Sequence, residues 1–218
     1  MLENKYSKFL TVILIMVIVI IVILLSVFGY DMYRKITTDR VAASVVNEFN
    51  DNINKPENNE ESNSETVTPI LNEEVVNQET TTGGNKVTLK GYNVVGTIEI
   101  PKIKLNYPIL ERTTPDSIEL SVAMLYGPGP NQVGNTVIIG HNYRNGSFFG
   151  NNDKLAIGDK IYITDTTGTR IEYNIYNIYE PTADDADYFD RDTAGKREIS
   201  LSTCTDNSKA RLVIWAAE

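Results

Sequence analysis

The feature that most constrains the fold is a series of short apolar or alternating runs that recur from about Lys90 to the end of the chain. Gly, Pro, Asn and Asp separate the runs, which is typical of strands joined by tight turns. Short helices are predicted over 115–122, where Pro115 opens the first turn, and around 147–151. We predict strands over 96–100, 106–110, 135–141, 160–164, 170–180, 198–204 and 211–216, with a further short one over 124–126. Seven or eight short strands in roughly 130 residues predict an all-β domain, a small barrel or a sandwich.

The N-terminal part contains a run without charges from Phe9 to Tyr30, dominated by Ile, Val and Leu. As a helix this run would be about 33 Å long, enough to cross a hydrocarbon core of about 30 Å. Residues 25–29 (LSVFG) match a small-residue cleavage site poorly, so an uncleaved signal anchor is favoured over a signal peptide. We therefore predict a transmembrane segment at 9–30.

The orientation of this segment is set by opposing signals. Lys5 and Lys8 favour a cytoplasmic N-terminus, whereas the basic residues that follow the run oppose it. Long C-terminal domains are exported largely regardless of flanking charge. We therefore expect residues 1–8 to form a cytoplasmic tail and the C-terminal domain to lie outside the cell membrane.

A polar stretch separates the two parts. Residues 41–88 carry nine acidic and two basic side chains and contain no aromatic residue after Phe49. A segment of this kind buries too little apolar surface to offset the entropy of ordering it. Residues 37–49 would extend the membrane helix by a few turns, but we interpret 31–88 as a disordered extracellular linker that precedes a domain at 89–218.

Composition excludes several classes of function. The formal net charge is −9 and no basic stripe is present, so nucleic-acid binding is not expected. One cysteine excludes an intrachain disulfide and a multi-cysteine metal site. With one histidine, a zinc site would depend on carboxylates, which is an uncommon ligand set. We therefore expect no cofactor and no metal ligand among the principal site residues.

The only cysteine, Cys204, ends an apolar run, 199–204 (ISLSTC), and a polar segment follows it. Free cysteines are among the most buried residue types, so a core position is the ordinary expectation. A thiol at a strand end is accessible to a substrate, and an unpaired thiol in an exported domain suggests a chemical role. Thiolates are strong nucleophiles, and Cys204 is our candidate for one.

His141 and Arg211 also lie at the ends of apolar runs. Each is more commonly a surface or structural residue, yet an imidazole beside a thiol can take its proton and later protonate a departing amine. In an antiparallel hairpin, the six residues after Cys204 would form a loop and bring Arg211 to the neighbouring strand edge. A guanidinium there would hold a carbonyl oxygen or an oxyanion. The three residues together predict a thiol acyl-transfer site.

Several segments resemble the sortase family. Residues 201–204 (LSTC) with 211–213 (RLV) are similar to its signature, in which a TLxTC strand precedes a catalytic arginine, although Ser200 stands where many sortases have Thr. Residues 137–142 (VIIGHN) resemble the sortase histidine strand. Residues 96–103 (GTIEIPKI) and 107–109 (YPI) resemble the first strands. The likeness spans about 94–216 in the expected order.

This resemblance implies an eight-stranded β-barrel of a membrane-anchored cysteine transpeptidase from Gram-positive bacteria. By motif, Cys204 would be the nucleophile, His141 its acid/base partner and Arg211 the stabiliser of the oxyanion or substrate. Such an enzyme cuts a surface protein after the Thr of an LPxTG-type sorting motif and forms a thioester. It then joins the acyl group to an amine of a cell-wall precursor or a pilin lysine.

The resemblance also implies a substrate groove lined by the loop from Glu180 to Arg197, in which Tyr188 and Phe189 would contact the apolar residue of the motif. Near the reacting groups we expect Asn142, Ser202 and Thr203 to bind substrate. The same loop contains five aspartates, and some class A sortases bind calcium there; we interpret it here as a solvated acidic loop. The aspartates are Asp184, Asp185, Asp187, Asp190 and Asp192.

Subclass and function leave alternatives open. The 18 residues from Glu180 to Arg197 resemble the short layout of class D, whereas the Leu-Ser-Thr-Cys-Thr run and the Asn-Tyr-Pro-Ile segment resemble class B. A class C enzyme would be expected to carry a lid motif and a second membrane helix. A thiol peptidase that uses water as the acceptor is one alternative function. A membrane-tethered β-sandwich adhesion or binding module, with a structural Cys204, is another.

Overall fold

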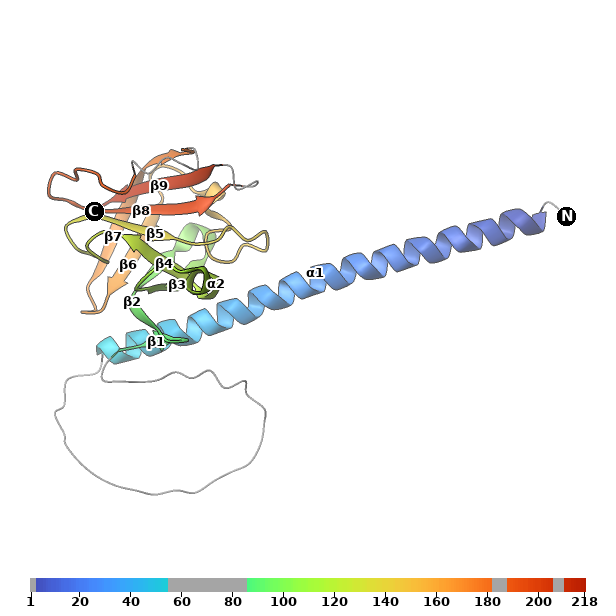
Figure 1. The fold of residues 1–218 in the computed structure, drawn as a ribbon, viewed down its shortest axis with the longest axis horizontal. Helices are drawn as coiled ribbons and strands as arrows, with labels where there is room; N and C mark the ends of the chain where they lie inside the picture. The colour runs from blue at the N-terminus through green and yellow to red at the C-terminus, as the bar shows by residue number, and fades with distance from the viewer. Residues whose placement is uncertain (1–2, 55–85, 182–187, 206–209) are drawn as a thin grey trace, which may run out of the picture.

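The computed structural model describes residues 3–54, 86–181, 188–205 and 210–218 of the chain, and a single long helix leads into a closed sheet (Figure 1). The helices are α1 Glu3–Asn54 and α2 Pro115–Leu120, with 3-10 turns at Pro101–Ile103 and Asn152–Lys154. The strands are β1 Thr88–Leu89, β2 Tyr92–Ile100, β3 Leu105–Leu110, β4 Val122–Tyr126, β5 Gly134–Ile139, β6 Lys160–Asp165, β7 Arg170–Tyr179, β8 Arg197–Cys204 and β9 Arg211–Ala217.

Eight of these strands form a closed β-barrel, as predicted. Their order is β2-β3-β4-β5-β8-β9-β7-β6, and β2 also pairs with β6, which closes the sheet. The two-residue β1 pairs with the first two residues of β2, Tyr92 and Asn93, before β2 enters the barrel. Closure removes the unpaired edges that a sandwich would leave. The interior is filled by branched aliphatic side chains, among them Ile98, Ile138 and Leu201, all without solvent exposure.

Two predicted elements differ in detail. The strand that was expected to reach His141 ends at Ile139, because the chain turns after Gly140 and Asn142 forms an isolated bridge with Phe148. A Cβ at Gly140 would lie 2.9 Å from Val122, so only glycine fits this turn without displacement. The helix expected around 147–151 is a turn, followed by the 3-10 turn at 152–154.

The long helix does not end at Tyr30 but continues to Asn54, so the first part of the expected linker, 31–54, is helical. Ala42, Val45, Val46 and Phe49 recur at three- and four-residue intervals and form one apolar face. All four are buried: Val45 and Phe49 pack on a cluster from β1–β4 that includes Leu110, and Ala42 joins the main core of the barrel. The composition of 41–88 as a whole concealed this stripe. The remaining linker, 55–85, lies outside the described residues.

Phe49 is the largest side chain in this contact and is 3% exposed. Truncation of a buried Phe to Ala typically costs about 3–5 kcal/mol. We expect Phe49→Ala to lower the free energy of separating α1 from the barrel by about 3 kcal/mol, since the site lies at the periphery. Hydrogen exchange of residues 40–52 should then accelerate about 100-fold. The exposed neighbour change Asn47→Ala is the control, and equal exchange in both variants would contradict the prediction.

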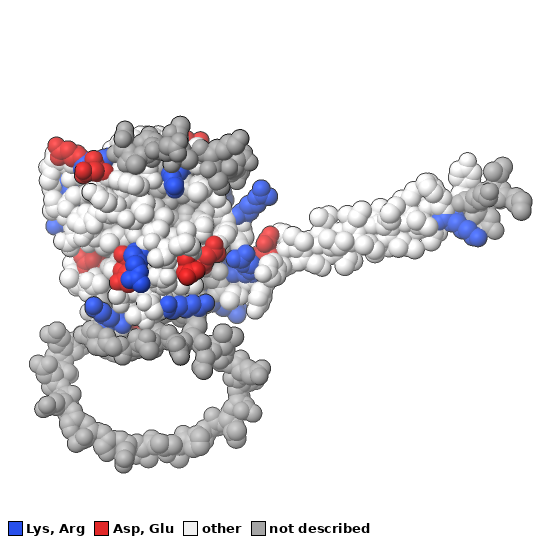
Figure 2. Space-filling view, in the orientation of Figure 1, with Lys and Arg blue, Asp and Glu red and all other residues white. Residues whose placement is uncertain are grey.

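The N-terminal half of α1 is unpartnered by protein. Its apolar side chains from Phe9 to Tyr30 are exposed, and α1 is the one helix of the described residues that is long and apolar enough to cross a membrane. Figure 2 shows this stretch free of charged side chains between a basic residue near its tip and the barrel, where charges reappear. An exposed apolar helix of this length suits a lipid environment, so it is a candidate membrane span.

Candidate active site

Strand pairing brings Cys204 and Arg211 together. They are the final pair of the antiparallel β8–β9 ladder, in which their Cα atoms lie directly opposite. Opposed residues of an antiparallel pair project to the same face of the sheet, so the thiol and the guanidinium share one side. Both are partly exposed. The hairpin expected from the sequence is therefore present.

His141 reaches this hairpin through the parallel pairing of β5 with β8. Ile139 pairs with Ser202 at the end of this ladder, so His141 follows β5 by two residues at the same end of the barrel at which Cys204 ends β8. Two hydrogen bonds fix the junction: the Gly140 amide donates to the Ser202 carbonyl at 3.3 Å, and Thr203 Oγ1 donates to the Gly140 carbonyl at 2.7 Å. The loop after His141 is held by the Phe149 amide, which donates to its carbonyl at 3.0 Å.

A cavity of about 520 Å³ opens at this point, within the usual range for ligand pockets. Cys204 lies in its wall beside Thr203 and Thr205, and Asn142 faces it from the histidine loop. The remaining lining residues are Tyr143, Arg144, Phe149, Gly150, Asp153, Glu180 and Leu212. The cavity wall thus holds a partly exposed thiol, with Arg211 opposite it in the β8–β9 ladder and the loop that follows His141 on the other side, an arrangement that suits attack on a carbonyl carbon.

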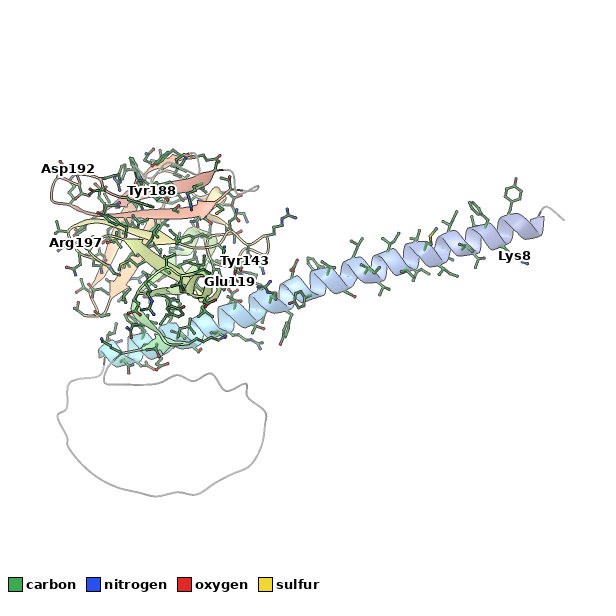
Figure 3. All side chains as sticks on the ribbon, in the orientation of Figure 1. Lys8, Glu119, Tyr143, Tyr188, Asp192 and Arg197 are labelled. Atoms are coloured by element: carbon green, nitrogen blue, oxygen red, sulfur yellow. The ribbon has the colours of Figure 1, made fainter. Side chains whose placement is uncertain are left out.

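Glu119 is a candidate functional residue that the sequence reasoning missed. Its Oε1 lies 3.1 Å from Nε2 of His141. This distance allows an ion pair when the imidazole is protonated, but the relative orientation of the two groups does not form a hydrogen bond. Its Oε2 accepts a hydrogen bond from the Tyr143 hydroxyl at 2.5 Å (Figure 3 labels both residues). Burial, reinforced by this carboxylate, raises the pKa of Tyr143 to about 12, so the hydroxyl remains a donor near neutral pH. Pro115 had indicated the helix α2, but not which face meets His141.

We expect Glu119→Gln to lower kcat/KM about 2- to 5-fold, because a partly exposed ion pair contributes up to about 1 kcal/mol. Glu119 is 53% exposed on its side chain and His141 33%. Because His141 is the only histidine, its imidazole NMR signals are assignable without ambiguity and should shift in this variant. Asp116→Asn, on the same helix, should leave the signals and the rate unchanged. Unshifted signals in Glu119→Gln would rule out the positioning role.

Three of the four residues expected to bind substrate lie inside the protein. Ser202 has no exposure and Tyr188 is 1% exposed; Ser202 Oγ donates to the Tyr188 hydroxyl at 3.3 Å. Thr203 is 4% exposed and bonds to Gly140, although it borders the cavity. These side chains therefore support the strands in this structure, whereas Asn142 lines the cavity and is only half-buried; its contact with substrate stays a prediction. The alternation of apolar and polar residues along β8 suggested that one face of the strand is exposed, but in the structure side chains cover both faces.

The segment before β8 is held by Arg191. Its guanidinium lies over the Trp215 ring at 4.1 Å and pairs with Glu198 at 2.7 Å, and it donates to Asn135 Oδ1 at 3.0 Å. Phe189 stacks on Tyr126 and borders a second cavity of about 400 Å³. Phe189, rather than Tyr188, is thus the accessible aromatic ring of this loop. The expected acidic cluster falls partly at Asp184, Asp185 and Asp187, outside the described residues.

The chain belongs to the sortase family: residues 98–218, more than half of its length, match the Sortase domain. Sortase A of Bacillus anthracis is 35% identical over 127 residues, which are 55% of this chain and 58% of that protein. The chain thus spans less than two thirds of that relative.

Solved structures agree on the fold. Sortase A from Corynebacterium diphtheriae has 29% identity and a TM-score of 0.53 over 58% of this chain and 60% of that one. The Sortase D5 transpeptidase of Clostridium perfringens has 24% identity and a TM-score of 0.59, over 82% of this chain and 98% of that one. At this identity the second likeness bears on the fold alone.

Proposed function

We propose that this protein is a cysteine transpeptidase that cleaves an LPxTG-type sorting motif of surface proteins and joins the new end to an amine. The observation that carries the proposal is the pairing of Cys204 with Arg211 at the end of the β8–β9 ladder, where Cys204 and the loop that follows His141 line one cavity. Family membership supports the same activity.

In the first half-reaction the Cys204 thiolate attacks the carbonyl carbon of the motif's Thr, and the resulting oxyanion is stabilised by the Arg211 guanidinium. The C–N bond to the next residue breaks, and the departing amine takes a proton from the His141 imidazolium. In the second half-reaction an amine attacks the thioester and loses a proton to His141. An amide forms and the thiolate is released.

The proposed amine belongs to a cell-wall precursor or to a pilin lysine, and the proposed location is the cell membrane of a Gram-positive bacterium with the barrel outside. The short segment between β7 and β8 supports a class D layout, and the sequence around Cys204 resembles class B. Calcium binding in the Glu180–Arg197 loop stays a prediction, because residues 182–187 with three of its five aspartates lie outside the described residues.

The test is mass spectrometry of the full chain in detergent with a pool of sorting-motif peptides, with and without amine acceptors. A Cys204 adduct that resolves to a new amide is the expected result. An adduct that resolves only to a free carboxylate would indicate a thiol peptidase. A protein that forms no adduct and whose thiol resists alkylation would support the binding module instead.

A further inference from the structure

The helix that crosses the membrane also touches the active-site loop. Arg34 of α1 lies over the Tyr143 ring, 5.5 Å from its centroid. Lys35 Nζ donates to the Gly146 carbonyl and Asn145 Nδ2 donates to the Asp31 carbonyl, each at 3.5 Å. Residues 31–35 therefore run alongside the loop 143–146, which follows His141.

These contacts fix the height of the loop above the bilayer. The charge-free run ends at Tyr30, and Arg34 lies about 6 Å further along the helix. A headgroup layer is about 5–7 Å thick on each side of the hydrocarbon core. Phe28, Tyr30 and Tyr33 are exposed around this level, where aromatic side chains are enriched at membrane interfaces. The loop 143–146 thus lies within or beside the headgroup layer.

The same loop forms one wall of the catalytic cavity. Tyr143 and the exposed Arg144 border the cavity that contains Cys204. In Figure 3, Tyr143 and Glu119 lie on the side of the barrel from which α1 departs, and Asp192 lies on the opposite side. In Figure 1 the arrowhead of β8, which ends at Cys204, points toward that same side.

The helix holds this geometry rigidly because it is continuous from the apolar run to Asn54 and docks on the barrel through Val45 and Phe49. The basic groups at this level, the exposed Arg34 and Arg144, suit an anionic lipid surface. Of the acidic residues of α1 nearby, Asp31 is exposed at this level, and Asp39, further along the helix, is engaged by Lys35 and Tyr107.

We propose that the loop 143–146 is a membrane-docking surface and that α1 keeps the mouth of the catalytic cavity at the phospholipid headgroups. The site then takes substrates whose reacting group is held close to the bilayer. The docking claim stands on the geometry of α1, and the claim about substrates rests on the proposed function.

Docking is tested by fluorescence quenching with the full chain in the Cys204→Ala background. A single fluorophore is placed by Arg144→Cys or, as the matched control, by Asp192→Cys. The vesicles contain phosphatidylcholine, phosphatidylglycerol and a lipid with a spin-labelled headgroup. We expect quenching several-fold stronger at 144 than at 192. Equal quenching at the two positions, or none at 144, would overturn the proposal.

A spacer variant adds an internal test. Seven helix-forming residues inserted between Tyr30 and Asp31 lengthen the helix by about 10 Å. Because seven residues make nearly two full turns, the parts of the helix before and after the insertion keep nearly the same rotational orientation. Quenching at 144 should then fall to the level at 192. Quenching that stays high despite the spacer would show that the helix does not set the height of the loop.

The substrate claim is tested with the same spacer in the Cys204-containing chain. A sorting-motif peptide joined to a lipid by a short tether should react at least tenfold more slowly with the spacer variant, whereas a free peptide should react equally with both. An unchanged rate for the tethered peptide would contradict the claim. Failure of the parent chain to consume even the free peptide would instead refute the proposed function, and the quenching result would remain interpretable.

Discussion

Replacing Cys204 with Ala should abolish the transpeptidation of sorting-motif peptides. The proposed reaction would proceed through a thioester at this sulfur, and no other cysteine exists in the chain to replace it. The change removes one partly exposed sulfur at a strand end, so the barrel should remain folded. Turnover is measured by mass spectrometry of the products, and folding by circular dichroism and thermal unfolding.

The result has a clear contrary outcome. A Cys204→Ala protein with undiminished turnover would refute the assignment of the nucleophile, whatever its stability. Loss of turnover together with loss of the folded state would leave the role of the sulfur open to a second measurement: alkylation of the unmodified protein at Cys204. Alkylation should abolish turnover while the thermal transition is retained, and full activity of the alkylated protein would also refute the assignment.

Replacing Arg211 with Ala should lower kcat/KM by roughly 10²–10³, the usual cost of removing one donor to an oxyanion. Arg211 lies opposite Cys204 in the ladder. We therefore expect its guanidinium to stabilise the negative charge that develops on the oxygen of the attacked carbonyl. Most of the loss should appear in kcat, because the interaction strengthens only in the transition state. Steady-state kinetics with a fluorogenic motif peptide measure both constants.

Two controls separate this role from general charge effects. Arg170 begins the neighbouring strand β7 and pairs with Glu99 at 2.7 Å on the exposed surface; Arg170→Ala should leave kcat/KM unchanged. Arg211→Lys keeps the charge but loses the planar fork, so its activity should lie between those of Arg211→Ala and the parent. A loss confined to KM in Arg211→Ala would indicate substrate binding without oxyanion stabilisation.

The sequence predicted the strands that carry the candidate site, but it did not predict which side chains near the site are buried. The alternation and turn residues of 90–218 are local signals, and they predicted most strands within one or two residues as well as the Cys204–Arg211 hairpin. Ser202 and Tyr188 were expected to contact substrate, but both side chains are buried. The reason is that strand β8 is covered on both faces. No alternation within a single strand reports what packs on its outer side.

The docked part of α1 shows the same division. Residues 41–88 are polar on average, and that average hid a stripe of four apolar residues with a helical period. The stripe becomes buried only because Leu110 and its neighbours, more than fifty residues later in the chain, provide an apolar surface on which it packs. Likewise, neither α2 nor the 143–146 loop carries a local sign that Glu119 contacts His141 or that Arg34 lies over Tyr143.

The sequence by itself determined the β-rich character of the C-terminal domain and the position of a charge-free run long enough to span a membrane, and it singled out Cys204, His141 and Arg211 as candidate site residues. Each of these depends on residue type, period and short-range spacing. Tertiary structure alone decided the closure of the barrel through β2–β6, the partner of His141 and the seat of α1 beside the active-site loop. These depend on contacts between residues far apart in the chain, where the free energy of packing selects among arrangements that local patterns leave equivalent.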